Sequence, residues 1–533
     1  MGIDRHRAGF RRHRRTGRRR SGDVTAGGEL VDTPGPLAAL ADATGRPTDP
    51  EPLSRAGAAT LRSRRHVRRT RLVHLAMNDS DRPTLVLRYA DVGITTYASL
   101  RVVGQPSRTV NWVVDEPILL AALAELTDAL PEPHGNEDRR EAIERALCRG
   151  PFATRDSELT VAFILGVLLI GTPGWQLLTE CAASPRPVLF ISPSARLARV
   201  PWGLLALPTA GPTREELVRA RQEAITASGR AAARIPWQLA DITEYTDGYR
   251  LMELVDILLA VPQNIVHSAR VPARWAARKD GPPILLLDPR VPGQRPDSAL
   301  GSVLGRPSEE TPLARHFAEL MRRRPVLPAV DSPSELFRRR DADRDWLSKL
   351  LMQQPSRLLY VGHASSADSE GGHADHAALH LACGAAIPGD APAIGDHRPL
   401  TASDLMALRM SMPPRVALLA CASGGDYQFD EATGLVAATI LGGAQLVTAT
   451  LWSLPTTAAY RQFVAEDGDP ADPMTDPMTE IVAAIDSAHE TDEAGCAVNR
   501  WQRAQMRRWR DGEASASPLY WGAVVSFAVD GAR

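Results

Sequence analysis

The stretch Leu358-Leu-Tyr-Val-Gly-His-Ala364, followed later by Val416-Ala-Leu-Leu-Ala-Cys-Ala-Ser-Gly424, decides the fold. Each half is an apolar run of strand length that ends at a reactive side chain, His363 in the first and Cys421 in the second. Buried parallel strands end at a common edge of an open α/β sheet, where such sheets place their ligand sites. The two stretches therefore predict an imidazole beside a thiol, which is the pairing of a cysteine nucleophile with its base.

Either residue taken alone has a simpler interpretation. The cysteine fits a buried core position, and the histidine fits a strand end with a satisfied hydrogen bond. Together they favour catalysis, because His before Cys at roughly 50 residues is the order of caspase-like peptidases. Small residues follow both side chains, as a tight turn with exposed backbone N–H groups requires.

Further blocks occur in an order that resembles the CHAT domains, a family of caspase- and separase-like cysteine peptidases. The blocks are Val188-Leu-Phe-Ile-Ser-Pro193, Val200-Pro-Trp-Gly-Leu-Leu205, the two stretches above, Leu400-Thr-Ala-Ser-Asp-Leu405, Gly442-Gly-Ala444, Val447-Thr-Ala-Thr-Leu-Trp452 and Ser517-Pro-Leu-Tyr-Trp-Gly-Ala523. The resemblance covers residues 155–533. It implies an α/β fold, a caspase-like three-layer αβα sandwich with a mostly parallel sheet.

The same resemblance implies the chemistry of a cysteine-type endopeptidase that acts through a Cys-His dyad and an acyl-enzyme intermediate. Cys421 would attack a peptide carbonyl and His363 would move the proton. The backbone N–H groups of Ala364 and Cys421 would form the oxyanion hole, where each donor is worth about 3 kcal/mol. A backbone carbonyl can orient the histidine in this fold, so no triad carboxylate is assigned.

Two departures from the family pattern affect these expectations. Ala364 stands where the family usually has Gly, yet Ala still offers its N–H. The family commonly has an acidic residue after the Trp, which helps its separase-like relatives bind a basic P1 side chain, but here that place is held by Thr456. We therefore expect a small or uncharged P1 side chain in preference to Arg or Lys.

Several residues near the two stretches are candidates for the substrate pocket. Asp426, Asp430 and Glu431 follow the nucleophile and either line the pocket or solvate a loop. Trp452 is either a core residue or a pocket wall, and Thr456 completes the candidate set.

A group of histidines offers a zinc-like alternative. His373, His376 and His380 have the spacing of metal ligands, with Asp375 or Cys383 as further donors. However, residues 377–382 are patterned as a strand in a family hairpin, so we expect no metal and no cofactor.

Composition fits a cytoplasmic enzyme. The net charge of −1 gives no bias toward nucleic acid or membrane. Five scattered cysteines without a Cys-x-x-Cys spacing favour a reducing compartment. The longest apolar run, Val161 to Ile170, is too short to span a membrane and predicts a buried helix.

The N-terminal part divides into two expected regions. Residues 1–69 are basic and predict a disordered tail, with nine arginines in the first 22 positions; nucleic-acid or acidic-partner contact through this tail is the alternative. Residues 70–150 predict a small α+β accessory module, with strands at 84–89, 93–97 and 100–103 and a helix after Asp115-Glu-Pro117.

The expected function is therefore cleavage of protein or peptide substrates, regulated by an activating protein partner that orders the loops near the site. The alternative is a catalytically quiet caspase-like module for interaction or signalling. The presence of both His363 and Cys421 favours the enzyme, because a binding module needs neither.

Overall fold

The computed structural model describes residues 82–114, 116–183, 185–209, 246–295, 298, 300–305, 308–366, 373–428, 433–464 and 476–533. All of them belong to the unit Ala76–Arg533. The basic segment 1–69, Asp430 and Glu431 lie outside the described residues.

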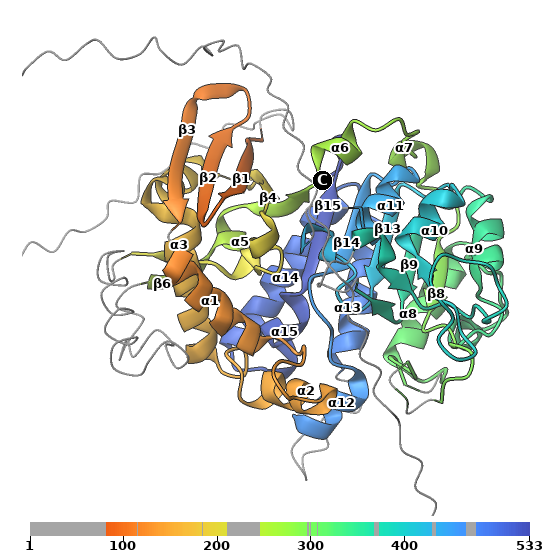
Figure 1. The fold of residues 1–533 in the computed structure, drawn as a ribbon. Coiled ribbons are helices and arrows are strands. Elements are labelled where there is room, and N and C mark those ends of the chain that lie inside the picture. The colour runs from red at the N-terminus through yellow and green to blue at the C-terminus, as the bar shows by residue number, and fades with distance from the viewer. Residues whose placement is uncertain are drawn as a thin grey trace, which may run out of the picture. The chain divides into compact units, whose positions relative to one another are not determined.

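A ten-stranded sheet forms the centre of this unit, in the order β3-β2-β1-β4-β7-β15-β14-β13-β9-β8 (Figure 1). Its strands are β1 (Thr84–Val92), β2 (Thr95–Val102), β3 (Gln105–Val114), β4 (Val188–Ser192), β7 (Asp256–Ala260), β8 (Ile284–Leu287), β9 (Arg357–Val361), β13 (Arg415–Leu419), β14 (Leu446–Thr450) and β15 (Val524–Ala528). Two small sheets accompany it, made of β10 (Ala364–Ser365), β11 (Ala378–Leu379) and β12 (Leu400–Thr401), and of β5 (Ala206–Pro208) and β6 (Thr246–Arg250).

Eight of the ten strands form two parallel blocks that run in opposite directions, and β2 and β3 extend one edge of the sheet by antiparallel pairing. One block is β1, β4, β7 and β15, and the other is β14, β13, β9 and β8. The antiparallel pair of β14 with β15 joins them. The carboxyl ends of β9 and β13 therefore lie at one edge of the second block, as the sequence predicts.

Helices cover both faces of the second block. Every residue of β9, β13 and β14 is buried, so side chains on both faces are shielded from water. On one face Arg357 pairs with Asp486 of α13 (Pro477–Ala488) at 2.8 Å. Against the other face α11 (Leu435–Leu441) packs on β14. This arrangement confirms the predicted α/β class with a mostly parallel sheet between helical layers.

The other helices among the described residues complete the layers and connections. They are α1 (Glu116–Ala129), α2 (Arg139–Cys148), α3 (Arg155–Cys181), α5 (Leu251–Leu254), α6 (Gln263–Val266), α7 (Trp275–Arg278), α8 (Pro312–Arg323), α9 (Arg344–Leu351), α10 (Ala402–Ala407), α12 (Thr457–Phe463), α14 (Ala494–Arg510) and α15 (Pro518–Trp521).

The strands expected for an accessory module belong to the large sheet. Leu85 of β1 pairs with Leu189 of β4 in parallel, so β1–β3 extend the sheet. The strand boundaries differ from the prediction, because residues 93–97 and 100–103 fall mainly within a single strand, β2. Gly104 then turns the chain with a φ of +78° into β3, a strand that the sequence analysis missed.

The apolar run at 161–170 lies in α3, a helix long and apolar enough to cross a membrane by length and composition alone. However, 72% of its most apolar window is buried inside the protein, which is the pattern of a core helix. Gly171 breaks the helix, with a φ of +62°. The helix also packs on β3, where Trp112 donates from its indole nitrogen to the carbonyl of Leu169 at 2.8 Å.

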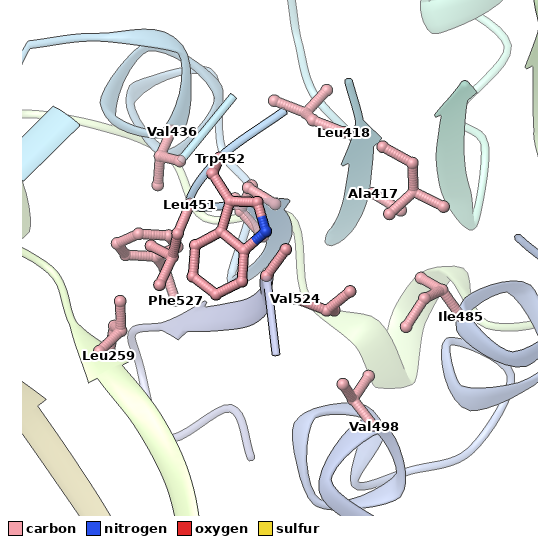
Figure 2. Packing of buried hydrophobic residues seen from close by; sticks show 14 of the residues in the cluster. Leu259, Ala417, Leu418, Val436, Leu451, Trp452, Ile485, Val498, Val524 and Phe527 are labelled. Carbon is pink, nitrogen blue, oxygen red and sulfur yellow. The ribbon is translucent and has the colours of Figure 1, made fainter. Parts of the chain in front are cut away.

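Trp452 is a core residue. Its side chain is fully buried, and its indole nitrogen donates to the carbonyl of Leu519 at 2.9 Å. Figure 2 shows the ring packed among apolar side chains that include Leu259, Val524 and Phe527. Of the two alternatives for Trp452, the structure supports the core residue, because its indole is enclosed among apolar side chains.

Candidate active site

The sheet register places His363 and Cys421 at the same edge. Val361 of β9 pairs with Leu419 of β13, and His363 and Cys421 each follow their strand by two positions. The backbone N–H of Gly362 continues the pairing by donating to the carbonyl of Leu419 at 3.3 Å. The two side chains thus begin from adjacent backbone positions, as the sequence predicts.

A backbone carbonyl orients the imidazole of His363. Its Nε2 lies 3.1 Å from the carbonyl oxygen of Gly301, and the side chain is buried. Because a carbonyl can only accept, Nε2 must carry the proton. In the neutral ring this leaves the lone pair on Nδ1, which is the atom available as a general base.

The carbonyl of Gly301 is itself held by a charged network. Arg338 donates from Nη1 to this oxygen at 2.9 Å and to Oδ1 of Asp288 at 3.0 Å. The hydroxyl of Ser302 donates to Oδ2 of Asp288 at 2.6 Å. Asp288 is buried directly after β8 and Arg338 lies in a loop, and both have a positive φ, near +50°. Backbone strain of this kind often accumulates at functional sites.

The electrostatics of His363 favour its neutral form. Burial lowers the pKa of His363 below its ordinary value of 6.5, and the positive charges of Arg139 and Arg338 lower it further. The carbonyl of Gly301 and the carboxylate of Asp288 act in the opposite direction. A neutral imidazole at neutral pH is the state that a general base requires.

A tyrosine fixes the turn that carries His363. The hydroxyl of Tyr360, which is fully buried in β9, donates to the carbonyl of His363 at 2.6 Å. A Cβ at position 362 would lie 2.7 Å from this hydroxyl oxygen, so only Gly362 fits without displacement. The glycine therefore allows the close approach that holds the backbone of the histidine.

Cys421 lies on a tight turn that is fastened to β14. The hydroxyl of Thr450 donates to the carbonyl of Ala420 at 2.5 Å, and Ser423 donates from Oγ to the carbonyl of Leu418 at 2.6 Å. Ala422 has a φ of +48°, which reverses the chain immediately after Cys421. The thiol is half-buried and belongs to a free cysteine.

An arginine lies close to the thiol. Nη2 of Arg139, at the start of α2, is 4.0 Å from Sγ of Cys421. Within the described part of the chain, no hydrogen bond joins the ring of His363 to this sulfur. Catalytic hydrogen bonds are often long in unliganded enzymes and tighten with substrate.

The backbone geometry is compatible with the predicted oxyanion donors. The N–H of His380 donates to the carbonyl of His363 at 3.0 Å, so these residues form a hydrogen-bonded pair. The neighbouring pair of Ala364 with Leu379 is then non-hydrogen-bonded, which directs the N–H of Ala364 away from β11. The assignment of Ala364 and Cys421 to an oxyanion hole remains a prediction.

Two of the predicted pocket residues cap helices. The carboxylate of Asp426 accepts the backbone N–H of Val436 at 3.3 Å and that of Ala437 at 2.8 Å, both in α11. Burial raises the pKa of Asp426 to about 6. Thr456 accepts the N–H of Ala459 at 3.3 Å as the N-cap of α12. Because these contacts occupy Asp426, we no longer assign it to the pocket.

A carboxylate that the sequence analysis missed lies beside Ser453, three residues before Thr456. Oε1 of Glu132 accepts the backbone N–H of Ser453, next to Trp452, at 2.8 Å. Its Oε2 is buried and has no hydrogen-bond partner among the described residues. Spacing gives no signal for this residue, because Glu132 and Ser453 are distant in the sequence.

The histidines considered as metal ligands do not converge. His380 contacts His397 through ring nitrogens 3.0 Å apart, and Nδ1 of His397 donates to the carbonyl of Cys383 at 3.0 Å. His373 and His376 instead lie edge to face. No group of three potential metal ligands occurs among the described residues.

Comparison with known proteins identifies the family. The family model described as the CHAT domain matches residues 171–466, which is more than half of the 533 residues. The chain belongs to the CHAT domain family. The resemblance inferred from the sequence motifs is therefore confirmed, and the match includes both His363 and Cys421. Arg139 and Glu132 precede the matched region.

Solved structures give distant similarities. Two crystal structures of the Saccharomyces cerevisiae separase–securin complex align with TM-scores of 0.38 and 0.34, each at 10% identity. Each alignment covers 84% of this chain but only 30% of the separase chain. No curated protein gives a significant match.

Proposed function

We propose that this CHAT protein is a cysteine-type endopeptidase that cleaves protein or peptide substrates. The observation that carries the proposal is the common sheet edge of His363 and Cys421, with the imidazole oriented by the carbonyl of Gly301. This orientation leaves Nδ1 of a neutral ring as the base, which a passive structural histidine does not need.

The reaction follows from the positions of these groups. Nδ1 of His363 takes the thiol proton as Sγ of Cys421 attacks the scissile carbonyl carbon, and the carbonyl oxygen becomes negatively charged. The backbone N–H groups of Ala364 and Cys421 stabilise that charge. The carbon–nitrogen bond breaks, the amine leaves with the proton from His363, and water hydrolyses the thioester with the same base.

The substrate preference follows from the local charges. The guanidinium of Arg139 near Sγ disfavours a second cation, and Asp426 already caps α11. These contacts support a small or uncharged P1 side chain. The buried Oε2 of Glu132 is the feature that would favour Arg or Lys instead, because a buried carboxylate can offset the desolvation of a cation.

Regulation by a protein partner and a cytoplasmic location are part of the proposal. A partner that moved Arg139 away from Sγ would open the thiol to substrate, so the isolated protein should be slow. The described cysteines are all free, and a nucleophilic thiol persists in a reducing compartment. Strong constitutive cleavage by the purified full-length protein would contradict partner regulation.

The alternative, a catalytically quiet interaction module, is favoured by one observation. Arg139 contacts the thiol, whereas His363 does not bond to it within the described residues. Turnover of a peptide library by the wild-type protein, compared with Cys421→Ala, distinguishes the two functions. Cleavage that is lost in the variant supports the peptidase, and no cleavage with or without candidate partners supports the module.

A further inference from the structure

A groove of about 860 Å³ lies at the edge of the sheet opposite the candidate active site. It is formed by the chain before α7, by the end of α10 and by the last turn of α11, which gather around the amino ends of β13 and β14 (Figure 1). One wall is fixed by the N–H of Ala273, which donates to the carbonyl of Gly443 at 2.8 Å. The groove is therefore a formed feature of the surface.

Much of the groove surface is apolar. Val271 on its wall is 88% exposed, the highest value among the large hydrophobic side chains in the described ranges. Met406 and Leu441 extend this surface. Methionine adapts its shape to different apolar partners. An exposed apolar wall rimmed by polar groups is typical of an interaction site.

A buried arginine lines the groove with unused donors. The side chain of Arg270 is only 3% exposed, and its Nη2 donates to Asp530 at 2.8 and 2.7 Å. Its Nε and Nη1 have no hydrogen-bond partner among the described residues. A buried donor without a partner is destabilising, so an acceptor placed in the groove would remove that unfavourable contribution.

Two further arginines strengthen the positive charge. Nη1 of Arg278 is buried and without a partner in the described structure, and Arg409 is exposed on the rim. No acidic residue lines the groove within the described ranges. Asp530 neutralises Arg270 from outside the lining, and within the described ranges no ion pair involves Arg278 or Arg409, so these two arginines provide the positive charge of the groove.

We propose that this groove binds an acidic, amphipathic peptide segment of a partner protein. Carboxylates of the segment would accept hydrogen bonds from Arg270, Arg278 and Arg409, because guanidinium groups match carboxylate geometry. Aliphatic side chains next to the carboxylates would cover Val271 and Met406. The apolar wall disfavours nucleic acid, which would need a surface that is polar and basic throughout.

The position of the groove leaves the candidate active site open. Cys421 follows the carboxyl end of β13, whereas the groove residue Met410 precedes the amino end of the same strand. A partner docked in the groove can therefore remain bound during cleavage. This inference goes beyond the proposed function, since peptide binding here requires neither His363 nor Cys421.

The test uses the full chain carrying Cys421→Ala, so that binding is measured without cleavage. A random dodecapeptide phage library is panned on this protein and counter-selected on the same protein with Arg278→Glu and Arg409→Glu. A selected peptide, labelled with fluorescein, is then titrated by anisotropy. The matched control is Arg274→Glu, because Arg274 is exposed nearby but does not line the groove.

We expect the selected peptides to be enriched in Asp and Glu next to Leu, Ile or Met. The Arg278→Glu and Arg409→Glu double variant should bind at least tenfold more weakly, with an unchanged melting temperature, and Arg274→Glu should bind within twofold of the parent. The inference is overturned if counter-selection leaves no enriched peptides, if the enriched peptides are neutral or basic, or if Arg274→Glu weakens binding as much as the double variant does.

Discussion

Nε2 of His363 lies 3.1 Å from the carbonyl oxygen of Gly301, which fixes both the orientation and the tautomer of the candidate base. The protonated nitrogen faces the loop after β8, and Nδ1 is left for proton transfer. In the part of the chain that the structure describes, no carboxylate forms a hydrogen bond with the ring. Asp288 acts one step further away, through the Arg338 side chain that shares the Gly301 carbonyl.

The first prediction concerns His363 itself. His363→Ala removes the base, so kcat/KM for a cleaved peptide should fall by roughly two or more orders of magnitude. The melting temperature should change little, because the backbone contact of His363 with Tyr360 remains. His373→Ala, at a described histidine outside the site, is the matched control and should retain full activity.

The second prediction concerns Asp288 as a positioning residue. Asp288→Asn removes the negative charge that raises the pKa of His363, so the acidic limb of the kcat/KM profile should move to lower pH. Because the Gly301 loop is held less firmly, kcat should also fall by about tenfold, with KM nearly unchanged. A purely structural role would lower stability without moving the limb, and that result would contradict the assignment.

The third prediction concerns acid stability. Burial lowers the pKa of His380 and of His489 to about 3, from an ordinary 6.5, so the unfolded chain binds protons first as the pH falls. Each histidine should lower the free energy of unfolding by up to about 1.4 kcal/mol per pH unit below 6.5. Asp426 has the opposite effect on the free energy of unfolding, which it raises as the pH falls from 6 to 4. Its raised pKa means that the folded state binds the proton before the unfolded chain does.

Urea titrations from pH 8 to 4.5 measure this dependence. His489→Gln serves as a comparison, because an amide can keep the hydrogen bond to Thr448 without titrating. The variant should show a shallower loss of stability toward acid. A stability that stays level down to pH 4.5 would refute the buried neutral histidines.

The fourth prediction concerns specificity. Profiling with a proteome-derived peptide library should show small or uncharged residues at P1 more often than Arg or Lys, because Arg139 adds a positive charge near the thiol. Dominant Arg at P1, lost in Glu132→Gln, would show that Glu132 supplies the acid that is absent at Thr456. If the Arg preference were instead lost on changing Asp430 or Glu431, the loop after Cys421 would supply the acid that binds the P1 side chain.

The sequence predicted the parts of the site that depend on local pattern. The apolar runs before His363 and Cys421 became β9 and β13, since a buried parallel strand leaves a clear signal. The residues that orient or surround His363 and Cys421 have no such signal. Gly301 and Asp288 belong to a loop, and Arg139 comes from a helix far away in the chain, so tertiary packing alone brings them together.

The candidate pocket residues illustrate the same limit. Asp426 and Thr456 were pocket candidates from their positions in the motifs, with a solvated loop as the alternative for Asp426, and in the structure both side chains accept backbone N–H groups at helix starts, as short polar residues often do. Trp452 was placed correctly at a strand end, yet its indole enters the core. A sequence motif therefore predicts where a residue lies relative to a strand or helix, but tertiary packing determines what its side chain contacts.

Covalent capture of Cys421 tests the central claim most directly. The purified protein is treated with peptidyl acyloxymethyl ketones that carry Asp, Arg, Leu or Ala at P1, and the modified peptide is identified by mass spectrometry. The account predicts an adduct on Cys421, which is lost in Cys421→Ala and retained in Cys148→Ala, where the other exposed thiol has been removed. Labelling that persists in Cys421→Ala would contradict the assignment of the nucleophile.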